Sequence, residues 1–221
     1  MDTQAASPPD ATRSNAVLSL LGVVVFLGAG AFAAHAYPGG THWGRDTSGA
    51  HLTTFFCDLL RPVALNGDDN AAGARAAQLA LLALALGLGP FFRVAQTLLD
   101  LSGWRLALLL TGAYAGRIAL ILVAAGTGRL PPVIHDGSIL LGGPLGLLAL
   151  TLTVGWSWRL SRPIALTGVF GLGLGLWNLV QYAREAVLHA PSWPGLPLVQ
   201  KATMLGLLAF VTLLSLRGLR R

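Results

Sequence analysis

Residues 164–189 read IALTGVFGLGLGLWNLVQYAREAVLH, an apolar run that acquires polar side chains toward its end. The run is long enough to cross a bilayer as a helix, which takes roughly 20 apolar residues. The polar residues follow at intervals of three or four and therefore share one helix face: Asn178, Gln181, Tyr182, Glu185 and His189. Because polar groups in hydrocarbon are costly, this stretch predicts a transmembrane helix with a functional polar face.

The whole chain has the composition of a multi-pass membrane protein. Of its 221 residues, 54% are hydrophobic and 11% are charged, whereas a soluble domain carries about 25% charged residues. We predict an all-α fold of six transmembrane helices in a lipid bilayer, over residues 16–36, 76–99, 104–125, 138–156, 164–187 and 199–216. Residues 126–137, with two consecutive prolines, predict a turn before the fourth helix.

The remaining segments predict the domain organisation. We expect a disordered cytoplasmic tail at 1–15, a transmembrane domain at 16–216 with a structured outer loop at 37–75, and a basic cytoplasmic tail at 217–221. Six spans leave both termini on one side, and the excess of arginine there predicts an N-in/C-in orientation. The end of the first span has the small-x-small form of a signal-peptidase site without a positive leader, so its cleavage stays open.

Charge and cysteine content exclude two classes of function. The net charge is +6, but the basic residues are scattered between apolar runs and gather only at the C-terminus. This distribution is typical of an anchor beside anionic lipid and excludes a nucleic-acid partner. A single cysteine, Cys57, excludes an intrachain disulfide and a multi-cysteine metal site.

A lone arginine in the third span predicts a ligand pocket. Arg117 lies roughly 18 Å from the inner end of its helix and Asn178 roughly 21 Å from the same side, at 1.5 Å per residue. The matching depths predict a pocket between the third and fifth spans, open to the outer leaflet. Arginine binds phosphate and carboxylate in a forked geometry, so the predicted ligand is an anionic lipid headgroup or lipid-linked substrate. The predicted binding residues are Arg117, Tyr114, Asn178, Gln181, Tyr182 and Glu185. The alternative is structural, with Arg117 bonded to Asn178, Gln181 or backbone carbonyls.

Histidines and acids of the predicted outer side favour a second function. All five histidines fall there: His35, His42, His51, His135 and His189. Three histidines with a carboxylate hold Zn²⁺ and leave a position for water, and His35, His135 and His189 each end a span. With Asp58, His135 and Glu185 as acid/base candidates, the alternative is a metal-dependent or acid/base membrane hydrolase. The sequence leaves open whether the protein is an enzyme.

Cys57 and the glycines each permit more than one interpretation. Cys57 is either a thiol nucleophile beside Asp58 or a small buried apolar residue. Pairs of glycines four residues apart, at 112 and 116 and at 171 and 175, predict close packing of the third and fifth spans. A structural or partner-binding subunit, a homo-oligomer and a small transporter remain open.

The segment between the first and second spans has a residue pattern that is found in other membrane proteins. Tyr37-Pro38-Gly39-Gly40 follows the first span, and Cys57-Asp58-Leu59 precedes the second. This arrangement resembles bacterial six-helix integral membrane proteins of uncharacterised activity, which have a Tyr-Pro-Gly-Gly turn and a (Ser/Cys)-Asp-Leu stretch at these places. The resemblance implies a protein of the bacterial inner membrane. It also implies that Tyr37, Pro38, Gly39, Gly40 and Asp58 belong to the loop that forms the site, which makes Tyr37 a further predicted ligand-binding residue.

Overall fold

The structure is a computed structural model that describes residues 9–44, 53–126, 132–191 and 193–220. Over these residues the fold is all-helical, with two isolated β-bridges. The prediction of six spans is confirmed: six helices are long and apolar enough to cross a membrane. The elements are α1 (Pro9–Ala36), α2 (Phe56–Leu59), α3 (Ala71–Leu98), α4 (Gly103–Gly126), α5 (Pro132–Gly137), a π-helical segment η1 (Ser138–Gly142), α6 (Gly143–Ser157), α7 (Arg162–Leu188) and α8 (Leu196–Leu219).

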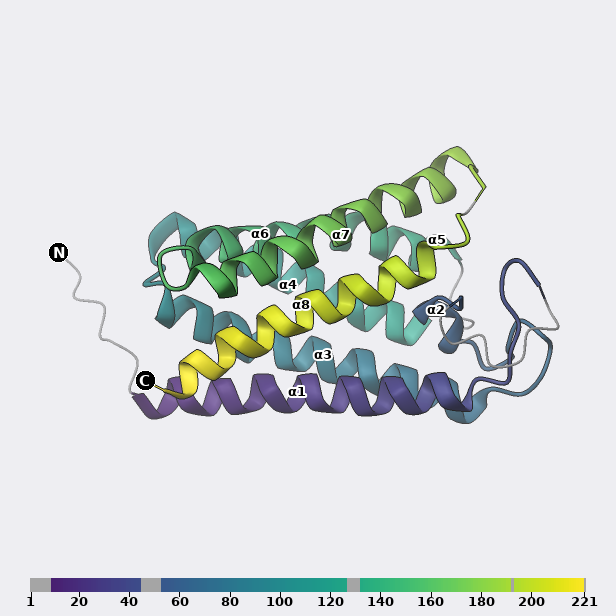
Figure 1. Cartoon of the computed structure of the whole chain (residues 1–221), viewed down its shortest axis with the longest axis horizontal. Coiled ribbons are helices and arrows are strands. Elements are labelled where there is room, and N and C mark those ends of the chain that lie inside the picture. Colours follow the sequence, from purple (N-terminus) through teal and green to yellow (C-terminus); the bar gives the residue numbers. More distant parts are fainter. Residues whose placement is uncertain (1–8, 45–52, 127–131, 192, 221) are drawn as a thin grey trace.

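The spanning helices form a ring. Each packs against the next spanning helix along the chain, and α8 closes the ring on α1 while also contacting α3. Where α8 meets α1, the buried Ser215 hydroxyl donates to the Ser19 hydroxyl at 3.0 Å. The start of α1 and the end of α8 lie at one end of the bundle, which we call the terminal end, and α2 lies at the other, the loop end (Figure 1).

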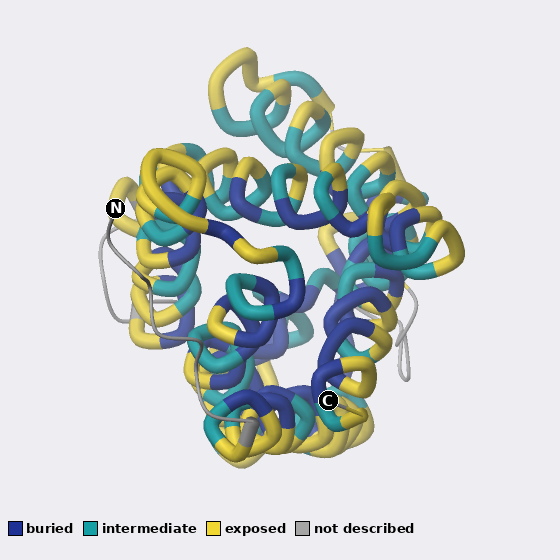
Figure 2. Tube along the Cα trace, turned by 90° about the vertical axis from the view of Figure 1, so that its left-hand side faces the viewer, coloured by how far each residue is buried: buried dark blue, intermediate teal, exposed yellow. Residues whose placement is uncertain are grey.

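Large apolar side chains cover the outside of the ring. Viewed from the terminal end, the exposed positions lie on the outer faces of the helices (Figure 2). On α7 alone, Leu166, Phe170 and Leu176 are each more than half exposed. A water-soluble bundle would bury such residues. The arrangement is that of helices which face hydrocarbon.

Glycines allow the helices of the ring to approach closely. A Cβ added to Gly116 of α4 would lie 2.7 Å from the Cα of Gly146 on α6. One added to Gly171 of α7 would lie 2.8 Å from the backbone nitrogen of Leu207 on α8. Both predicted glycine pairs therefore lie at helix contacts, and their partners are α6 and α8. Backbone approach of this kind is a main source of association energy between helices in lipid.

Both ends of the transmembrane domain are more helical than predicted. The expected tail at 1–15 is wrong from Pro9 onward, because α1 begins there; residues 1–8 lie outside the described residues. Proline at the first helical position and Asp10 in the first turn both favour this start. At the other end α8 continues to Leu219, so most of the expected basic tail is helix, and Arg221 lies outside the description.

The predicted turn at 126–137 is also partly wrong. Residues 132–137 are helix α5, and they lead through η1 directly into α6. Proline at a helix start costs no hydrogen bond, since the first turn has no intrahelical acceptor for its N–H. His135 and Asp136 consequently lie on a helix at the loop end.

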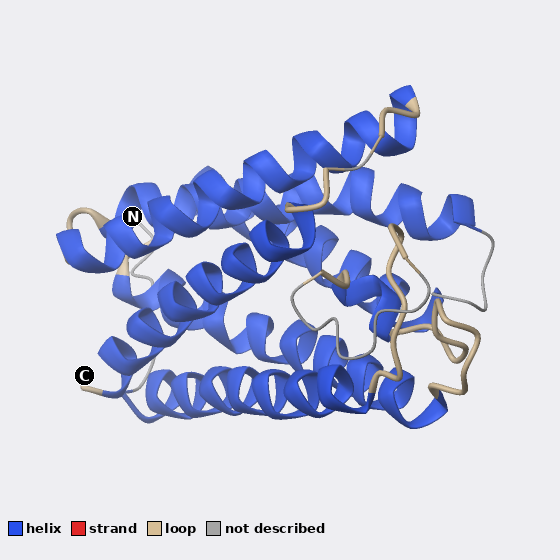
Figure 3. Cartoon of the chain, turned by 45° about the vertical axis from the view of Figure 1, so that its right-hand side comes forward, coloured by secondary structure: helices blue, strands red, loops and turns tan. Residues whose placement is uncertain are grey.

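The described parts of the connection between α1 and α3, residues 37–44 and 53–70, lie at the loop end (Figure 3). Gly40 has φ +87, and its missing Cβ leaves room for the backbone of Asn66. The Asn70 amide donates to the carbonyl oxygens of Leu59 and Arg61 at 3.1 and 2.8 Å. These bonds hold α2 beside the start of α3, which begins at Ala71, so the expected outer loop of 37–75 ends at residue 70.

Replacing glycine by alanine tests the contact between α4 and α6. Gly116→Ala should destabilise the bundle by about 1–3 kcal/mol, because the new methyl group overlaps backbone atoms. Gly173→Ala is the matched control: nothing lies within 4 Å of its added Cβ, so higher helix propensity should leave stability equal or raise it by up to about 1 kcal/mol. Denaturant unfolding in detergent, followed by circular dichroism, measures both. Equal stability of the two variants would contradict close packing at Gly116.

Candidate functional site

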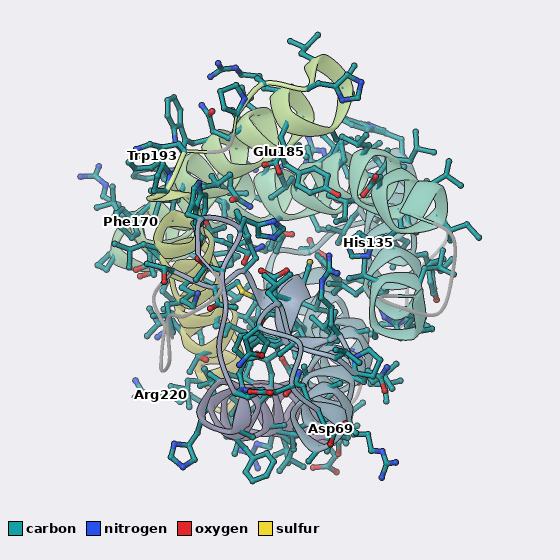
Figure 4. All side chains as sticks on the ribbon, turned by 90° about the vertical axis from the view of Figure 1, so that its right-hand side faces the viewer. Asp69, His135, Phe170, Glu185, Trp193 and Arg220 are labelled. Atoms are coloured by element: carbon teal, nitrogen blue, oxygen red, sulfur yellow. The ribbon has the colours of Figure 1, made fainter. Side chains whose placement is uncertain are left out.

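A polar cavity of about 370 Å³ lies at the loop end of the bundle. We call it the vestibule. Its polar walls come from the segment around α2 and from α5, α7 and α8: His42, Asp58, Arg61, His135, Asp136, Asn178, Tyr182, Glu185, Gln200 and Thr203. Viewed from the loop end, Glu185 and His135 lie in the same half of the bundle, and Asp69 lies at the opposite edge (Figure 4).

Asp58 is the most buried charged group of the vestibule, at 2% exposure. Its Oδ1 lies 3.2 Å from His42 Nε2 and 3.4 Å from Arg61 Nε. Its Oδ2 accepts the backbone N–H of Phe55 at 3.2 Å. A buried carboxylate needs such partners. The hydrogen bond that His42 donates to the Asp58 carboxylate raises the pKa of His42 against the opposing effect of burial.

Two side chains of α8 hold α2 in place. The Phe56 backbone N–H donates to Gln200 Oε1 at 2.8 Å, and Lys201 Nζ donates to the carbonyl oxygen of Thr54. Non-helical backbone at the depth of a membrane is tolerated only where protein or water satisfies its polar groups. Gln200 and Lys201 meet that requirement, so α2 forms one wall of the vestibule.

The opposite wall is built from α5 and α7. The Tyr182 hydroxyl donates to Asp136 Oδ1 at 2.7 Å, which ties the two helices together. Asn178 and Glu185, at spacings of four and three from Tyr182, line the same cavity. This part of the predicted polar face of the fifth span is therefore directed into the vestibule.

A second, apolar cavity of about 320 Å³ adjoins the vestibule inside the ring. We call it the chamber. Its walls are side chains of α1, α3, α4, η1, α6 and α8, including Phe26, Leu88, Leu120 and Val211. The two cavities share the wall residues Cys57, Ile139, Gly143, Leu147 and Gln200. A cavity with many polar wall residues thus adjoins an apolar one.

The predicted acid/base candidates meet in the vestibule. Asp58, His135 and Glu185 all line it, from three separate parts of the chain. Of the predicted ligand-binding residues, Asn178, Tyr182 and Glu185 line it as well. Whether any of them binds a ligand stays a prediction.

Arg117 lies elsewhere, and the prediction that it shares a pocket with Asn178 is wrong. Arg117 and Tyr114 line a different cavity, between α3 and α4. Arg117 Nε donates to the carbonyl oxygen of Ala85 at 2.7 Å, so a backbone carbonyl is its partner, as in the structural interpretation. Equal depth does not make two residues neighbours, because α6 lies between α4 and α7 in the ring.

Two further predicted ligand-binding residues have structural partners. The Tyr37 hydroxyl is buried and accepts the backbone N–H of Leu65 at 3.1 Å, and burial raises the pKa of Tyr37. Gln181 Oε1 accepts from Arg184 Nη1 at 3.0 Å on the same helix. Neither side chain lines the vestibule.

The predicted zinc ligands are not gathered at one place. His135 lines the vestibule, whereas His35 and His189 are exposed and do not line it. Within the described ranges, no three His, Cys, Asp or Glu side chains lie together as a metal site. His51 falls outside these ranges.

Arg61 and Gln200 line the vestibule but were not predicted as site residues from the sequence. Arg61 lies three residues after Asp58, the spacing of one helical turn, which signalled a possible ion pair. Gln200 and Thr203 are polar residues at a spacing of three in a mostly apolar span. That pattern is the same signal that drew attention to α7.

No family model, curated protein or solved structure matches this chain. The resemblance to bacterial six-helix membrane proteins therefore stays a prediction. The chemistry of the vestibule follows from its own side chains: three carboxylates (Asp58, Asp136 and Glu185), one permanent cation (Arg61) and two histidines (His42 and His135).

Cys57 lies in the wall that the vestibule and the chamber share, so the reactivity of its thiol measures access to this place. Burial raises its pKa from 9.0 to about 12. This protonated thiol is a poor nucleophile, which favours the buried apolar role for Cys57. At pH 8, which is below both pKa values, the thiolate fraction should be about a thousandfold lower than in the unfolded chain.

Labelling with a water-soluble maleimide tests this expectation, because Cys57 is the only cysteine. The folded protein should react at least about tenfold more slowly than the denatured chain at pH 8, because less thiolate forms, and its rate should keep rising with pH above 9. Gln200→Leu, which removes the acceptor of the Phe56 N–H, should loosen α2 and accelerate labelling. A folded protein that reacts as fast as the denatured chain would contradict the buried thiol.

Proposed function

We propose that the protein binds an amphipathic, lipid-like molecule, with its polar head in the vestibule and its hydrocarbon chain in the chamber. The observation that carries the proposal is the shared wall of the two cavities at Cys57, Gly143 and Gln200. The chamber wall is mostly apolar, with Arg117, Ser138 and Gln200 as its polar members, and suits a hydrocarbon chain. The vestibule offers donors and acceptors to a polar head.

The charges of the vestibule favour a head that carries hydrogen-bond donors. The lining of the vestibule includes three carboxylates, one arginine and two histidines. The Asp58 carboxylate already interacts with His42 and Arg61. Glu185 and the second carboxylate oxygen of Asp136, whose Oδ1 accepts from Tyr182, are the acceptors left for a ligand. An amine or several hydroxyl groups would satisfy them, whereas a purely anionic head would be repelled.

The proposed orientation of the protein in the membrane is based on the distribution of its basic residues. The positive-inside bias supports an N-in/C-in orientation, which puts the vestibule at the outer leaflet. The resemblance to bacterial six-helix proteins supports the inner membrane. A lipid or lipid-linked molecule of the outer leaflet would then be the ligand.

A leucine at the junction of the two cavities tests the proposal. Gly143 lines both, and a Cβ added there meets only Leu179 at 3.8 Å, so Gly143→Leu should fold. Displacing two methylene groups of a bound chain removes about 1.6 kcal/mol, or about tenfold in affinity. We expect at least that loss for lauroyl lysolipids with choline, ethanolamine and glycerol heads, counted by native mass spectrometry from detergent.

The matched control is Gly173→Leu, whose added side chain enters open space on α7. It should bind like wild type. Glu185→Gln should weaken binding of the ethanolamine head more than that of the glycerol head. Binding of no lysolipid by the wild type, or equal binding by Gly143→Leu and Gly173→Leu, would refute the proposed site.

The pair His42–Asp58 favours hydrolysis of the bound molecule as a second candidate function. Asp58 holds Nε2 of His42 at 3.2 Å, so Nδ1 remains to accept a proton from water. Water would then attack an ester or amide carbonyl, and the histidine would return the proton to the leaving group. Arg61, beside Asp58, is the cation available to the developing oxyanion.

Release of laurate from the ester-linked lysolipids tests this second candidate. His42→Gln and Asp58→Asn should each lower the rate by at least about a hundredfold, the usual contribution of a general base. His35→Gln changes an exposed histidine outside the vestibule and should have no effect. If the wild-type protein binds the probes and releases no laurate, the site binds without catalysing hydrolysis.

A further inference from the structure

The cavity that contains Arg117 lies in the terminal half of the bundle. It has a volume of about 260 Å³, and its polar lining consists of Asn15, Arg93, Tyr114 and Arg117. Arg93 lies five residues before the end of α3, so it is roughly 8 Å from that end at 1.5 Å per residue. The cavity therefore extends from the terminal face toward the middle of the membrane.

The charge of this cavity is opposite to that of the vestibule. Two guanidinium groups line it, and in the described part of the chain no carboxylate does. Within the same residues the ion pairs are those of Asp58 with His42 and Arg61, so neither lining arginine has an acidic partner. Arginines inside membranes normally pair with acids or carbonyls, or mark the path of an anion.

Three neighbouring residues determine the position of the Arg117 guanidinium: two contact it and one leaves room for it. Nε donates to the Ala85 carbonyl oxygen at 2.7 Å, and the Tyr114 ring centroid lies 5.7 Å from its Cζ. Gly89 provides the space, because a Cβ added there would lie 3.0 Å from both Cζ and Nη1. Among described residues, Nη1 and Nη2 make no hydrogen bond. A fixed guanidinium with two unused nitrogens is suited to bidentate binding of an oxyanion.

Arg93 provides the second cation near the entrance. It is exposed, and its only described hydrogen bond joins Nη1 to Gln96 Oε1 at 3.3 Å. Moving Arg93 toward an anion therefore breaks one exposed hydrogen bond, which costs little. Asn15 adds an amide from α1, although its Nδ2 already donates to the Ala11 carbonyl oxygen at 2.9 Å.

We propose that this cavity binds a phosphate-type anion between Arg117 and Arg93. The shared ligand chemistry is a phosphate group, carried either by a phospholipid head of the leaflet at the terminal end or by a soluble phosphate. The site is separate from the vestibule and does not depend on the function proposed for it.

Two probes separate the sources of phosphate. Inorganic phosphate is titrated calorimetrically into the protein in detergent, and phosphatidylglycerol is counted by native mass spectrometry from phosphatidylcholine nanodiscs that contain it. Arg117→Gln and Arg93→Gln should each weaken binding by at least about tenfold, since each removes a charge-assisted hydrogen bond. Binding of inorganic phosphate identifies a soluble ligand, and retention of phosphatidylglycerol alone identifies a lipid head.

Arg105→Gln is the matched control. Arg105 lies on α4 like Arg117, but it packs over the Trp104 ring outside the cavity, so its loss should leave both probes bound as in the wild type. Arg93 is exposed, so its variant keeps the test decisive even if Arg117→Gln does not fold. The proposal is overturned if the wild type binds neither probe, or if folded Arg93→Gln binds both as tightly as Arg105→Gln.

Discussion

Hydrocarbon offers no hydrogen bonds, so every polar group that the chain places at membrane depth must find its partner within the protein. The helices satisfy their own backbone. The exceptions are the short segment around α2 and Arg117 in the middle of α4. Gln200 and Lys201 satisfy the backbone at Phe56 and Thr54, and the Ala85 carbonyl oxygen accepts from Arg117. Both places border a cavity, because irregular backbone and charge interrupt the close packing of apolar helices.

The polarity of the interior of the ring consequently changes along the length of the bundle. The vestibule at the loop end is rich in acceptors, the chamber is apolar, and the cavity at the terminal end is lined by two arginines. Adjacent cavities share walls: Cys57 and Gln200 at one junction, and Phe92, Ala113 and Arg117 at the other. The two ends of the bundle therefore differ in chemistry, acceptors at one and guanidinium groups at the other, and the space between them is mostly apolar.

Glycine determines how tightly the ring can close around these cavities. The contacts of Gly116 with Gly146 and of Gly171 with Gly206 bring helix backbones together. Elsewhere glycine faces outward: Gly155 and Gly173 are exposed, and no described neighbour lies within 4 Å of a Cβ built on either. Close glycine contacts thus hold neighbouring helices of the ring together, while its interior keeps the cavities described above.

The six spans could be predicted from the amino-acid sequence, because an apolar run of sufficient length has one stable arrangement in a bilayer. The candidates Asp58, His135 and Glu185 could be predicted as well, since polar residues at the ends of spans are visible in the pattern alone. Which residues meet depends on how the helices pack. Depth along a helix follows from residue number, whereas the order of helices around the ring does not, and α6 lies between the helices of Arg117 and Asn178. The separation of one predicted pocket into an acceptor-rich vestibule and a cationic cavity is the consequence of that order.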